Sequence, residues 1–478
     1  MDADTLVIGA GFGGLSAALH LADAGQRVVL CEALNYPGGC ASTFRRDGLQ
    51  FEAGATLFFG FGEGQLMHRW VQRFGLDVQA DRLAPVLTLR APGLELVVDP
   101  ERDAFVERLA ALPGAPQAAI RRFFHAQARL AAGLHPVLEQ PDLLPPWGPA
   151  ALLSHAVHLP RYLPLAGALG RPAASLLART GADFEPLRLW LDAACQITVQ
   201  AAASEAEAPF ALSAVDMFFK GAYHVRGGIG ALATALVRAI RARGGDVQLA
   251  TRVRRLERRA GGWAVHTRRG VVTAERVVAN VLPQDLARLA DVRSPRLDAL
   301  GRRVRGGWGA AMLYLVVADE GLPPHAFHLQ LVGESRRPLI EGNLVLCSVS
   351  DAREERSPPG TRTVTVSTHV PLPTDAAAVE AVQARMRRTV AERAPELRVV
   401  RELTASPRTF QRFTRRHGGY VGGVPRRTGL GQYLDLLHRP VAPGLYLVGD
   451  TVFPGQSTLA TAVGGQRVAR TLDARVVA

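Results

Sequence analysis

The sequence predicts an α/β fold in which a parallel-sheet domain is interleaved with a second, α+β domain. Three observations predict it. The chain opens with a strand–helix–strand pattern over residues 5–32, βα patterns return at 216–285 after a long helical stretch, and four β-type runs follow between 309 and 370. A βα alternation that resumes after a long insertion indicates two interleaved domains rather than two in series.

The opening unit carries the clearest motif. Residues 5–8 are a short apolar run typical of a buried parallel strand, and Gly9, Gly11 and Gly14 follow at the spacing G-x-G-x-x-G before an amphipathic helix. Gly9 permits a tight turn, Gly11 lets the backbone approach a pyrophosphate, and Gly14 lets helix and strand pack closely. This context predicts a dinucleotide site rather than a purely structural turn.

Glu32 ends the second strand of this unit, which spans residues 27–31. A carboxylate in this place can accept a hydrogen bond from a ribose 2′-OH. An acid rather than an arginine argues against a 2′-phosphate, so NADP is not expected here.

Composition sets the class of protein. With 478 residues, 48% hydrophobic and 21% charged, the chain is long enough for two or more globular domains. The formal net charge is +13, but Lys220 is the only lysine and the arginines are scattered without a basic, aromatic-rich stripe. A general preference for arginine over lysine explains this pattern, so we expect no nucleic-acid partner, and an anionic membrane surface is the more plausible anionic partner.

Targeting and metal signals are absent from the sequence. No apolar run reaches the ~18 residues of a membrane-spanning helix, and the first apolar segment is the opening strand, without the features of a signal peptide. The cysteines lack CxxC spacing, which fits a reducing compartment and argues against a zinc site. They are Cys31, Cys40, Cys195 and Cys347. We expect a cytoplasmic protein that is peripherally membrane-associated and has no metal site.

Glycines recur after Glu32. Gly38 and Gly39 provide backbone without side chains, across which a bulky ligand can lie. Residues 45–48 are a hairpin turn signal, and residues 51–56 return to another glycine-lined stretch.

The middle of the chain, residues 66–215, is predicted to be helical, with apolar residues at three-to-four spacing over 104–112 and 118–134. Residues 143–177 are apolar and rich in proline, and Arg161 interrupts them, so they cannot span a bilayer as one straight helix. We expect them to pack into the core, and the alternatives are that they cap an apolar pocket or dip into one leaflet.

Later elements return to β structure. A turn at Gly227–Gly230 opens a helix, strands are expected at 246–256 and 271–280, and the runs between 309 and 370 predict an antiparallel sheet with one face in solvent. An amphipathic helix is expected over 376–393.

The chain closes with a buried strand that ends at Gly449-Asp450 and a helix that begins at Thr458. An acid at such a strand end can bond the ribityl or pyrophosphate region of a flavin, and helix amides can face its ring or phosphates. The alternative is that Asp450 is only a turn residue.

Together, the opening fingerprint with Glu32, the Gly38-Gly39 pair, the Gly227-Gly228 turn and the closing GLYLVGDTVFPGQ resemble the FAD-containing carotenoid desaturase and isomerase family, within the amine-oxidase-like flavoproteins. The resemblance implies a Rossmann-type FAD-binding domain and a substrate domain with a sheet floor and helical lid. It also implies a long apolar polyene substrate that enters from the membrane. FFGFG at 58–62 and FPGQ at 453–456 look more like the carotene cis–trans isomerase and late-pathway desaturase branch.

The domain boundaries follow from this reading. We expect the FAD-binding domain over residues 1–80, 216–285 and 406–478, and the substrate domain with its helical cap over 81–215 and 286–405.

The resemblance implies that the FAD contacts come from the fingerprint, the double glycine, the 54–56 loop and several strand ends. These residues are Gly9, Gly11, Phe12, Gly13, Gly14, Glu32, Ala33, Gly38, Gly39, Cys40, Gly54, Ala55, Thr56, Val253, Asn280, Gly449, Asp450, Thr458, Leu459 and Ala460. Cys40 stands where many relatives have an arginine that binds the pyrophosphate, and Glu52 stands where aspartate is usual. A buried, inert thiol is expected at Cys40 rather than a covalent flavin link.

Four functions stay open. The first is a carotenoid desaturase that passes hydride from the polyene to the flavin, with Asp450, His224, His417 and Arg415 as candidate polar groups near the ring and an unknown final electron acceptor. The second is a redox-neutral carotene cis–trans isomerase. The third is a lipid-binding flavoprotein without turnover, and the fourth is an amine oxidase, which needs an aromatic cage beside the flavin.

Overall fold

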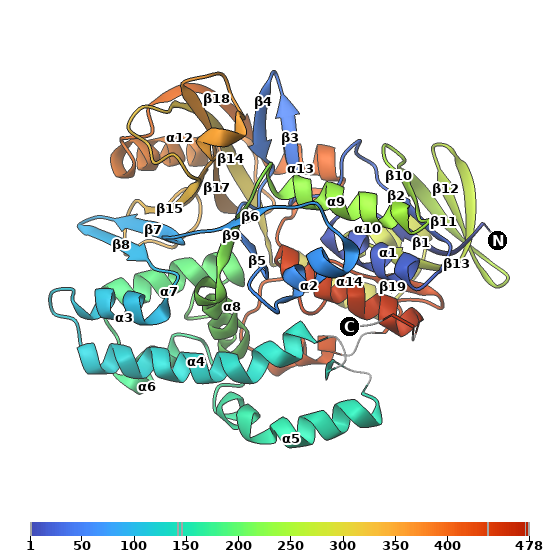
Figure 1. Cartoon of the computed structure of the whole chain (residues 1–478), viewed down its shortest axis with the longest axis horizontal. Helices are drawn as coiled ribbons and strands as arrows, with labels where there is room; N and C mark the ends of the chain where they lie inside the picture. Colours follow the sequence, from blue (N-terminus) through green and yellow to red (C-terminus); the bar gives the residue numbers. More distant parts are fainter. Residues whose placement is uncertain (1, 141–142, 145–146, 437–438, 474, 477–478) are drawn as a thin grey trace.

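The computed structural model describes residues 2–140, 143–144, 147–436, 439–473 and 475–476. Within these residues two seven-stranded sheets lie side by side, each covered by helices (Figure 1). The predicted α/β class is confirmed. The boundaries expected for the two domains stay a prediction.

The first sheet has the order β10-β2-β1-β13-β12-β11, and β19 pairs with β13. Its central pairs are parallel, and β11, β12 and β13 form an antiparallel meander. The strands are β1 (Ala3–Ile8), β2 (Val28–Cys31), β10 (Asp246–Gln248), β11 (Val253–Arg259), β12 (Gly262–Thr267), β13 (Gly270–Ala279) and β19 (Leu445–Leu447).

Helices cover both faces of this sheet, because successive residues of its central strands point to opposite faces and are apolar on both. Val7 packs with α1 (Phe12–Asp23), α9 (Ile229–Ala242) and α14 (Thr458–Leu472). Leu6 and Ile8 pack on the opposite face, which is covered by α10 (Pro283–Ala290) and α11 (Pro295–Val304).

The two ends of the chain meet on the first face. The hydroxyl of Ser16 on α1 donates a hydrogen bond of 2.6 Å to the carbonyl of Ala462 on α14. A Cβ on Gly465 would lie 2.8 Å from the Cβ of Ser16, so the absence of a side chain there lets the helices approach closely.

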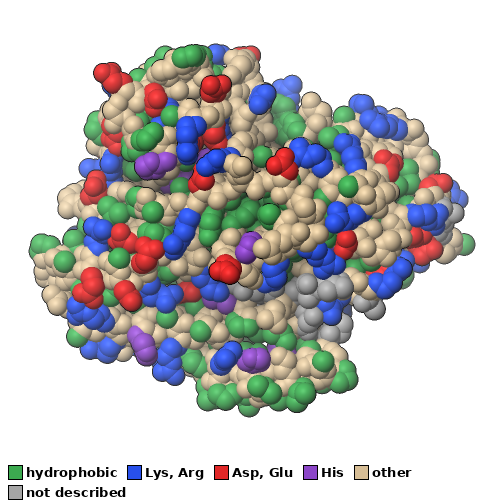
Figure 2. All heavy atoms as spheres, viewed as in Figure 1, with side chains coloured by type: hydrophobic (Ala, Val, Ile, Leu, Met, Phe, Trp, Pro, Cys, Tyr) green, Lys and Arg blue, Asp and Glu red, His purple; other side chains and the backbone are tan. Residues whose placement is uncertain are grey.

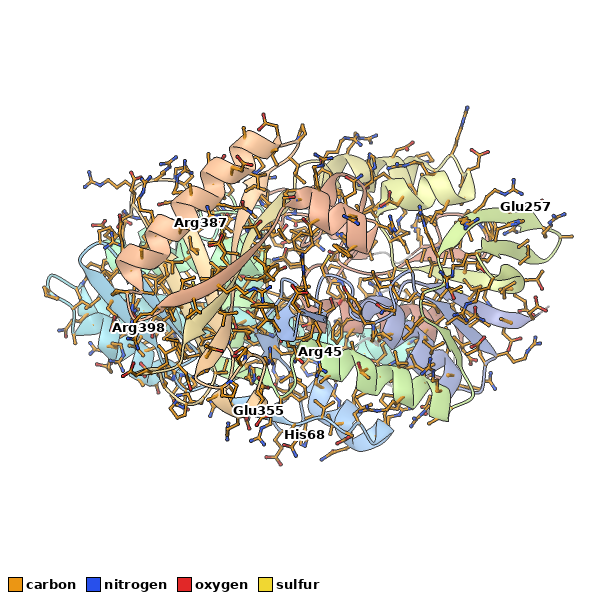
Figure 3. The ribbon with its side chains drawn as sticks, turned by 90° about the horizontal axis from the view of Figure 1, so that it is seen from above. Arg45, His68, Glu257, Glu355, Arg387 and Arg398 are labelled. Atoms are coloured by element: carbon orange, nitrogen blue, oxygen red, sulfur yellow. The ribbon has the colours of Figure 1, made fainter. Side chains whose placement is uncertain are left out.

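The second sheet has the order β18-β14-β17-β16-β15-β7-β8. Neighbouring strands are antiparallel except for β15 and β7, which are parallel. The strands are β7 (Leu87–Ala91), β8 (Leu94–Val98), β14 (Trp308–Ala318), β15 (Phe327–Val332), β16 (Leu344–Val349), β17 (Thr361–Pro371) and β18 (Val399–Ala405). Helix α12 (Ala376–Arg393) covers one face (Figure 3, where Arg387 marks this helix and Glu257 the far end of the first sheet).

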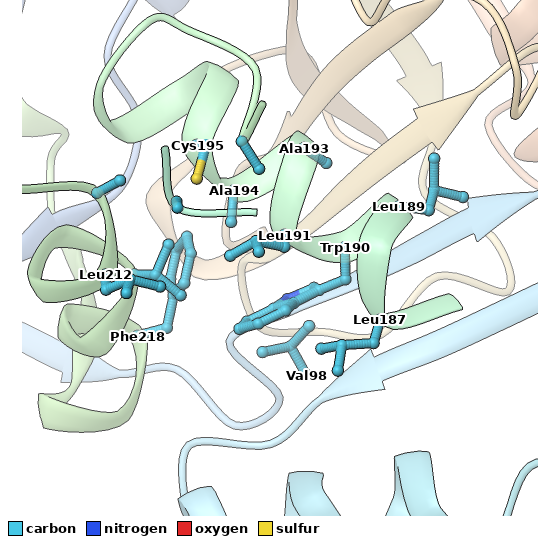
Figure 4. Packing of buried hydrophobic residues seen from close by; sticks show 14 of the residues in the cluster. Val98, Leu187, Leu189, Trp190, Leu191, Ala193, Ala194, Cys195, Leu212 and Phe218 are labelled. Carbon is cyan, nitrogen blue, oxygen red and sulfur yellow. The ribbon is translucent and has the colours of Figure 1, made fainter. Parts of the chain in front are cut away.

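A helical cap lies against the edge of this sheet formed by β7 and β8. Trp190 is buried at its centre, where its ring lies 4.9 Å from that of Phe105 and packs with Leu187 and Val98 (Figure 4). The cap helices are α3 (Arg102–Ala110), α4 (Gln117–Glu139), α5 (Pro149–Ala166), α6 (Ser175–Thr180), α7 (Glu185–Thr198) and α8 (Ala208–Lys220). Within the described part of the chain, no helix combines the length and apolarity needed to cross a membrane.

Short elements complete the fold. They are the hairpin β3 (Thr43–Arg46) and β4 (Leu49–Glu52), the small sheet of β5 (Phe58–Phe59), β6 (Ala80–Arg82) and β9 (Ala222–Val225), α2 (Leu66–Phe74), α13 (Pro407–Thr414) and the 3-10 turns Ala352–Glu354, His417–Gly419 and Leu430–Leu436.

Three sequence-based expectations are wrong. Residues 80–98 are not helical, because the alternating runs of β7 and β8 flank a Pro92-Gly93 turn and pair as a hairpin. The strand expected over 246–256 is two strands at opposite ends of the first sheet. They are separated at Ala250, which has φ +50° and donates its N–H to Leu34.

The third correction concerns the face of the second sheet that was expected in solvent. This face is buried: His328, Gln330 and Thr365 point away from α12 and are almost fully covered. The cap and the first sheet cover it, so the second sheet has no wet face at its centre.

Candidate flavin-binding and substrate site

One cavity of about 780 Å³ begins at the fingerprint and extends between the second sheet and the helical cap. Every predicted FAD contact except Gly14 lines it. The first sheet contributes the carboxyl ends of its parallel strands, where ligands bind in open α/β sheets. The second sheet contributes the face opposite α12, and α8 closes the far wall.

The fingerprint glycines leave no room for side chains. Gly9 has φ +92°, and a Cβ on Gly13 would lie 2.9 Å from the amide nitrogen of Gly449. A Cβ on Gly14 would overlap the carbonyl of Gly9, so Gly14 packs the helix on the turn and does not line the cavity. The bare amides at the start of α1 therefore face the cavity, as a pyrophosphate site requires.

Glu32 lies at the end of β2 with its carboxylate fixed from both sides. One oxygen accepts a 2.7 Å hydrogen bond from the N–H of Ala10, and the other accepts a 2.8 Å bond from the N–H of Leu34. Burial raises the pKa of Glu32, and the backbone amides oppose this by stabilising its ionised form. The carboxylate retains lone pairs for a ribose hydroxyl.

Cys40 is uncharged in its place after the double glycine, because burial raises the pKa of its thiol. The positive charge of Arg416 acts on this thiol in the opposite direction, and Arg416 lines the same part of the cavity. Its guanidinium contacts the carboxylate of Asp450 at 2.8 and 3.2 Å and donates a 2.7 Å bond to the carbonyl of Tyr420. Arg416 thus brings a cation to a site where the sequence at position 40 offers none.

The four candidate polar groups for catalysis divide into two pairs. Asp450 and Arg415 line the cavity, although the Asp450 carboxylate is already engaged by Arg416. His417 is exposed and does not line the cavity; its backbone N–H donates to Asp285 at 3.1 Å. His224 lines a separate small cavity, where it contacts Glu354 at 2.9 Å.

Glu52 belongs to the same buried network as His224. Its carboxylate lies 2.6 Å from Arg356, which in turn lies 2.7 Å from Glu354. A hydrogen bond of 2.8 Å from Thr43 completes the environment of Glu52. These contacts tie the β3–β4 hairpin to the connection between β16 and β17, and we assign them a structural role.

Sequence reasoning missed several lining residues. Arg416 lies next to the candidate Arg415, and the Arg-Arg pair before a glycine-rich run was the available signal. His135 lines the cavity from α4 and contacts Asp216 at 3.1 Å. Burial opposes ionisation of Asp216, but hydrogen bonds from His135 and Gln127 and the charge of Arg102 hold its pKa below the usual value.

The comparisons with known proteins agree with this geometry. The family model described as flavin containing amine oxidoreductase matches residues 12–472. Prolycopene isomerase 2 from an Oncidium hybrid cultivar is 25% identical over 97% of this chain and 82% of its own length. Hydroxyneurosporene desaturase from Rhodobacter capsulatus is 26% identical over 98% of both chains.

Solved structures support the fold. An oxidoreductase from Methanosarcina mazei has a TM-score of 0.67 at 20% identity and covers 97% of this chain and 99% of its own. A putrescine oxidase variant has a TM-score of 0.67 at 16% identity and covers 99% of both chains.

The resemblance expected from the sequence is confirmed, and so is FAD as the cofactor. The bare amides at α1, the fixed carboxylate of Glu32 and the side-chain-free surface at Gly38 and Gly39 fit a dinucleotide. The chain belongs to the flavin-containing amine oxidoreductase family and is an FAD oxidoreductase.

Proposed function

We propose that this flavoenzyme desaturates a long polyene of the carotenoid class. The observation that carries the proposal is the continuity of the cavity, which joins the FAD-contacting residues to a chamber between the second sheet and α8. Apolar side chains such as Leu57, Phe59, Met217 and Phe218 line this chamber. Two of the relatives that match nearly the whole chain are named for polyenes of this class.

FAD, when bound, supplies the two-electron acceptor that desaturation of a carbon–carbon bond requires. The chain's residues would bind and orient this group: the fingerprint amides would hold the pyrophosphate, and Glu32 would hold a ribose hydroxyl. The apolar walls align the polyene and exclude water from the reacting bond. Because Arg416 already engages the carboxylate of Asp450, we assign no proton-abstracting role to Asp450.

The second candidate is a redox-neutral cis–trans isomerase, which the prolycopene isomerase relatives favour. Incubation of the FAD-loaded protein with neurosporene and with prolycopene, under oxidising and under reducing conditions, separates the two. A product lighter by two hydrogens supports the desaturase, and an isomer of unchanged mass supports the isomerase. If neither polyene changes and neither bleaches the flavin, the chain is a lipid-binding flavoprotein and both enzymatic proposals fail.

The residues that line the cavity do not support amine oxidation as the function. Among the described residues that line the cavity, the aromatic side chains are phenylalanines, with no tyrosine or tryptophan to form a cage around an amine.

For the partner surface, we propose that α5 contacts an anionic phospholipid membrane. Leu153, Val157 and Leu163 are 68%, 69% and 68% exposed, and apolar side chains gather along this helix in Figure 2. The helix contains no acidic residue and carries Arg161, so its charge complements anionic headgroups.

Sedimentation with phosphatidylglycerol-containing vesicles tests this surface. Replacing Leu153 and Leu163 together by aspartate is expected to weaken binding at least about tenfold, because two large apolar side chains no longer enter the interface. Val400→Asp is the matched control, since Val400 is 66% exposed on β18, at the opposite end of the molecule in Figure 1. Equal loss in both variants, or no vesicle binding by the unmodified protein, would contradict the proposal.

A further inference from the structure

The cavity face of the second sheet carries several polar side chains among apolar ones such as Met312 and Leu346, in contrast to its other face. Under α12 the strands present apolar residues such as Leu329 and Val364. Toward the cavity, β15 presents His328 and Gln330, which are only 5% and 3% exposed. Polar side chains continue on this face along β16 and β17: Ser348, Thr365, Ser367 and His369.

The two β15 side chains have atoms without a partner. Nε2 of His328 and Oε1 of Gln330 are buried and make no hydrogen bond. Burial lowers the pKa of His328 to about 3, so its imidazole is neutral and offers one donor and one acceptor. Buried polar groups are normally paired, and an unpaired one loses free energy.

Two other polar groups on this face, His369 and Thr365, already have partners. Nδ1 of His369 lies 3.1 Å from the amide nitrogen of Gln196, and the hydroxyl of Thr365 donates to the carbonyl of Glu52 at 3.3 Å. On β15, by contrast, His328 and Gln330 each present a buried polar atom without a partner.

The strand register shows how far His328 and Gln330 lie from the predicted FAD-contacting residues. His328 is in register with Ser348, Thr365 and Tyr314 across β15, β16, β17 and β14. The Tyr314 hydroxyl donates a 2.8 Å bond to the carbonyl of Ala53, next to the predicted FAD contact Gly54. Three strand spacings of about 4.8 Å put β15 roughly 14 Å further into the chamber than β14.

We propose that the polyene carries a hydroxyl group on the end that lies over β15, and that His328 and Gln330 bind it. The inference rests on the proposed function and specifies its substrate class. A hydroxyl donates one hydrogen bond, which the Gln330 oxygen can take, and accepts another from the imidazole. A ketone only accepts, and a hydrocarbon leaves both side chains unpaired.

The test compares three probes on the FAD-loaded protein by quenching of flavin fluorescence. They are lycopene, lycopene with one hydroxyl near a chain end, and lycopene with a ketone at that carbon. The hydroxylated probe is expected to bind about tenfold or more tightly than lycopene, because lycopene leaves buried polar atoms unsatisfied. Gln330→Leu and His328→Leu are each expected to reduce this preference to within about threefold.

His369→Leu is the matched control, because it removes a polar ring from the same face whose Nδ1 already has a partner. It is expected to change the affinity for all three probes alike and to keep the preference. Thermal unfolding of each variant establishes that it folds, and the comparison of probes on the unmodified protein does not depend on any variant.

Equal affinity of the unmodified protein for lycopene and its alcohol overturns this inference and leaves the proposed function standing. A ketone that binds as tightly as the alcohol also overturns it, since Gln330 would then present its amide nitrogen. Failure of all three probes to bind overturns the inference together with the proposed function.

Discussion

Arg416 provides the sharpest test of how this chain holds FAD, because it brings a positive charge to the part of the cavity where position 40 has a cysteine. Its side chain is 15% exposed and that of Asp450 is 18% exposed, so the pair is largely shielded from water. Arg416→Gln removes the charge while keeping much of the side chain. Asp450 then keeps its negative charge without a partner on the wall of the cavity that we expect to receive FAD, and it would repel the cofactor's phosphates.

The magnitude follows from the contacts. A hydrogen bond to a charged group contributes about 1.5–3 kcal/mol, and Arg416 makes two with Asp450 at 2.8 and 3.2 Å. If about 2 kcal/mol of this appears in cofactor binding, the dissociation constant for FAD rises roughly thirtyfold. Arg412→Gln, an exposed arginine on α13, controls for the change in net charge.

The assay is titration of apoprotein with FAD, followed by flavin fluorescence. Adding Cys40→Arg to the Arg416→Gln protein should recover about tenfold of the lost affinity, since Cys40 lines the same cavity as Arg416 and an arginine there would return a cation to it. Unchanged FAD affinity in Arg416→Gln would refute the reasoning. So would an equal loss in Arg412→Gln.

Four further predictions follow. Glu32→Ala should weaken FAD binding about tenfold in the same titration, because a ribose hydroxyl loses its acceptor. Gly465→Ala should lower the unfolding free energy by about 1–3 kcal/mol in urea, since the new Cβ meets that of Ser16 at 2.8 Å. In the same urea titration, Trp190→Ala should lower the unfolding free energy by about 3–5 kcal/mol, because it leaves a cavity in the cap. Burial lowers the pKa of His20 from 6.5 to about 4, so between these two pH values the unfolded chain binds a proton that the folded protein does not. The unfolding free energy should therefore fall as the pH drops below 6.5, by up to about 1.4 kcal/mol per pH unit. In urea titrations at several pH values, His20→Leu should reduce this slope.

Local signals determine what the sequence could predict. The fingerprint places its glycines, helix and acid within a few turns of one another, so their joint role can be read from consecutive residues. Helix α12 matches the expected 376–393, because Asp375 accepts a 2.7 Å bond from the N–H of Ala378 and fixes its start.

The burial of a strand face by segments from other parts of the chain could not be predicted from the sequence. The alternation of β15, FHLQLV, is the same whether its polar side faces solvent or a cavity. The cap and the first sheet decide between the two, and both come from other parts of the chain. Arg416 was missed for the same reason: only the fold brings it to Cys40 and Asp450.

Asn280 shows how the cofactor cradle depends on three distant segments at once. It follows β13, and its side-chain oxygen would lie 3.2 Å from a Cβ on Gly13, while a Cβ on Gly449 would overlap the same oxygen. The carbonyl of Asn280 would lie 2.9 Å from a Cβ on Gly9. One amide side chain therefore fills the space that would otherwise admit side chains on the first and last loops. Gly9, Gly13 and Gly449 therefore all meet Asn280, a residue from the middle of the chain, so three distant segments together shape this part of the cavity wall.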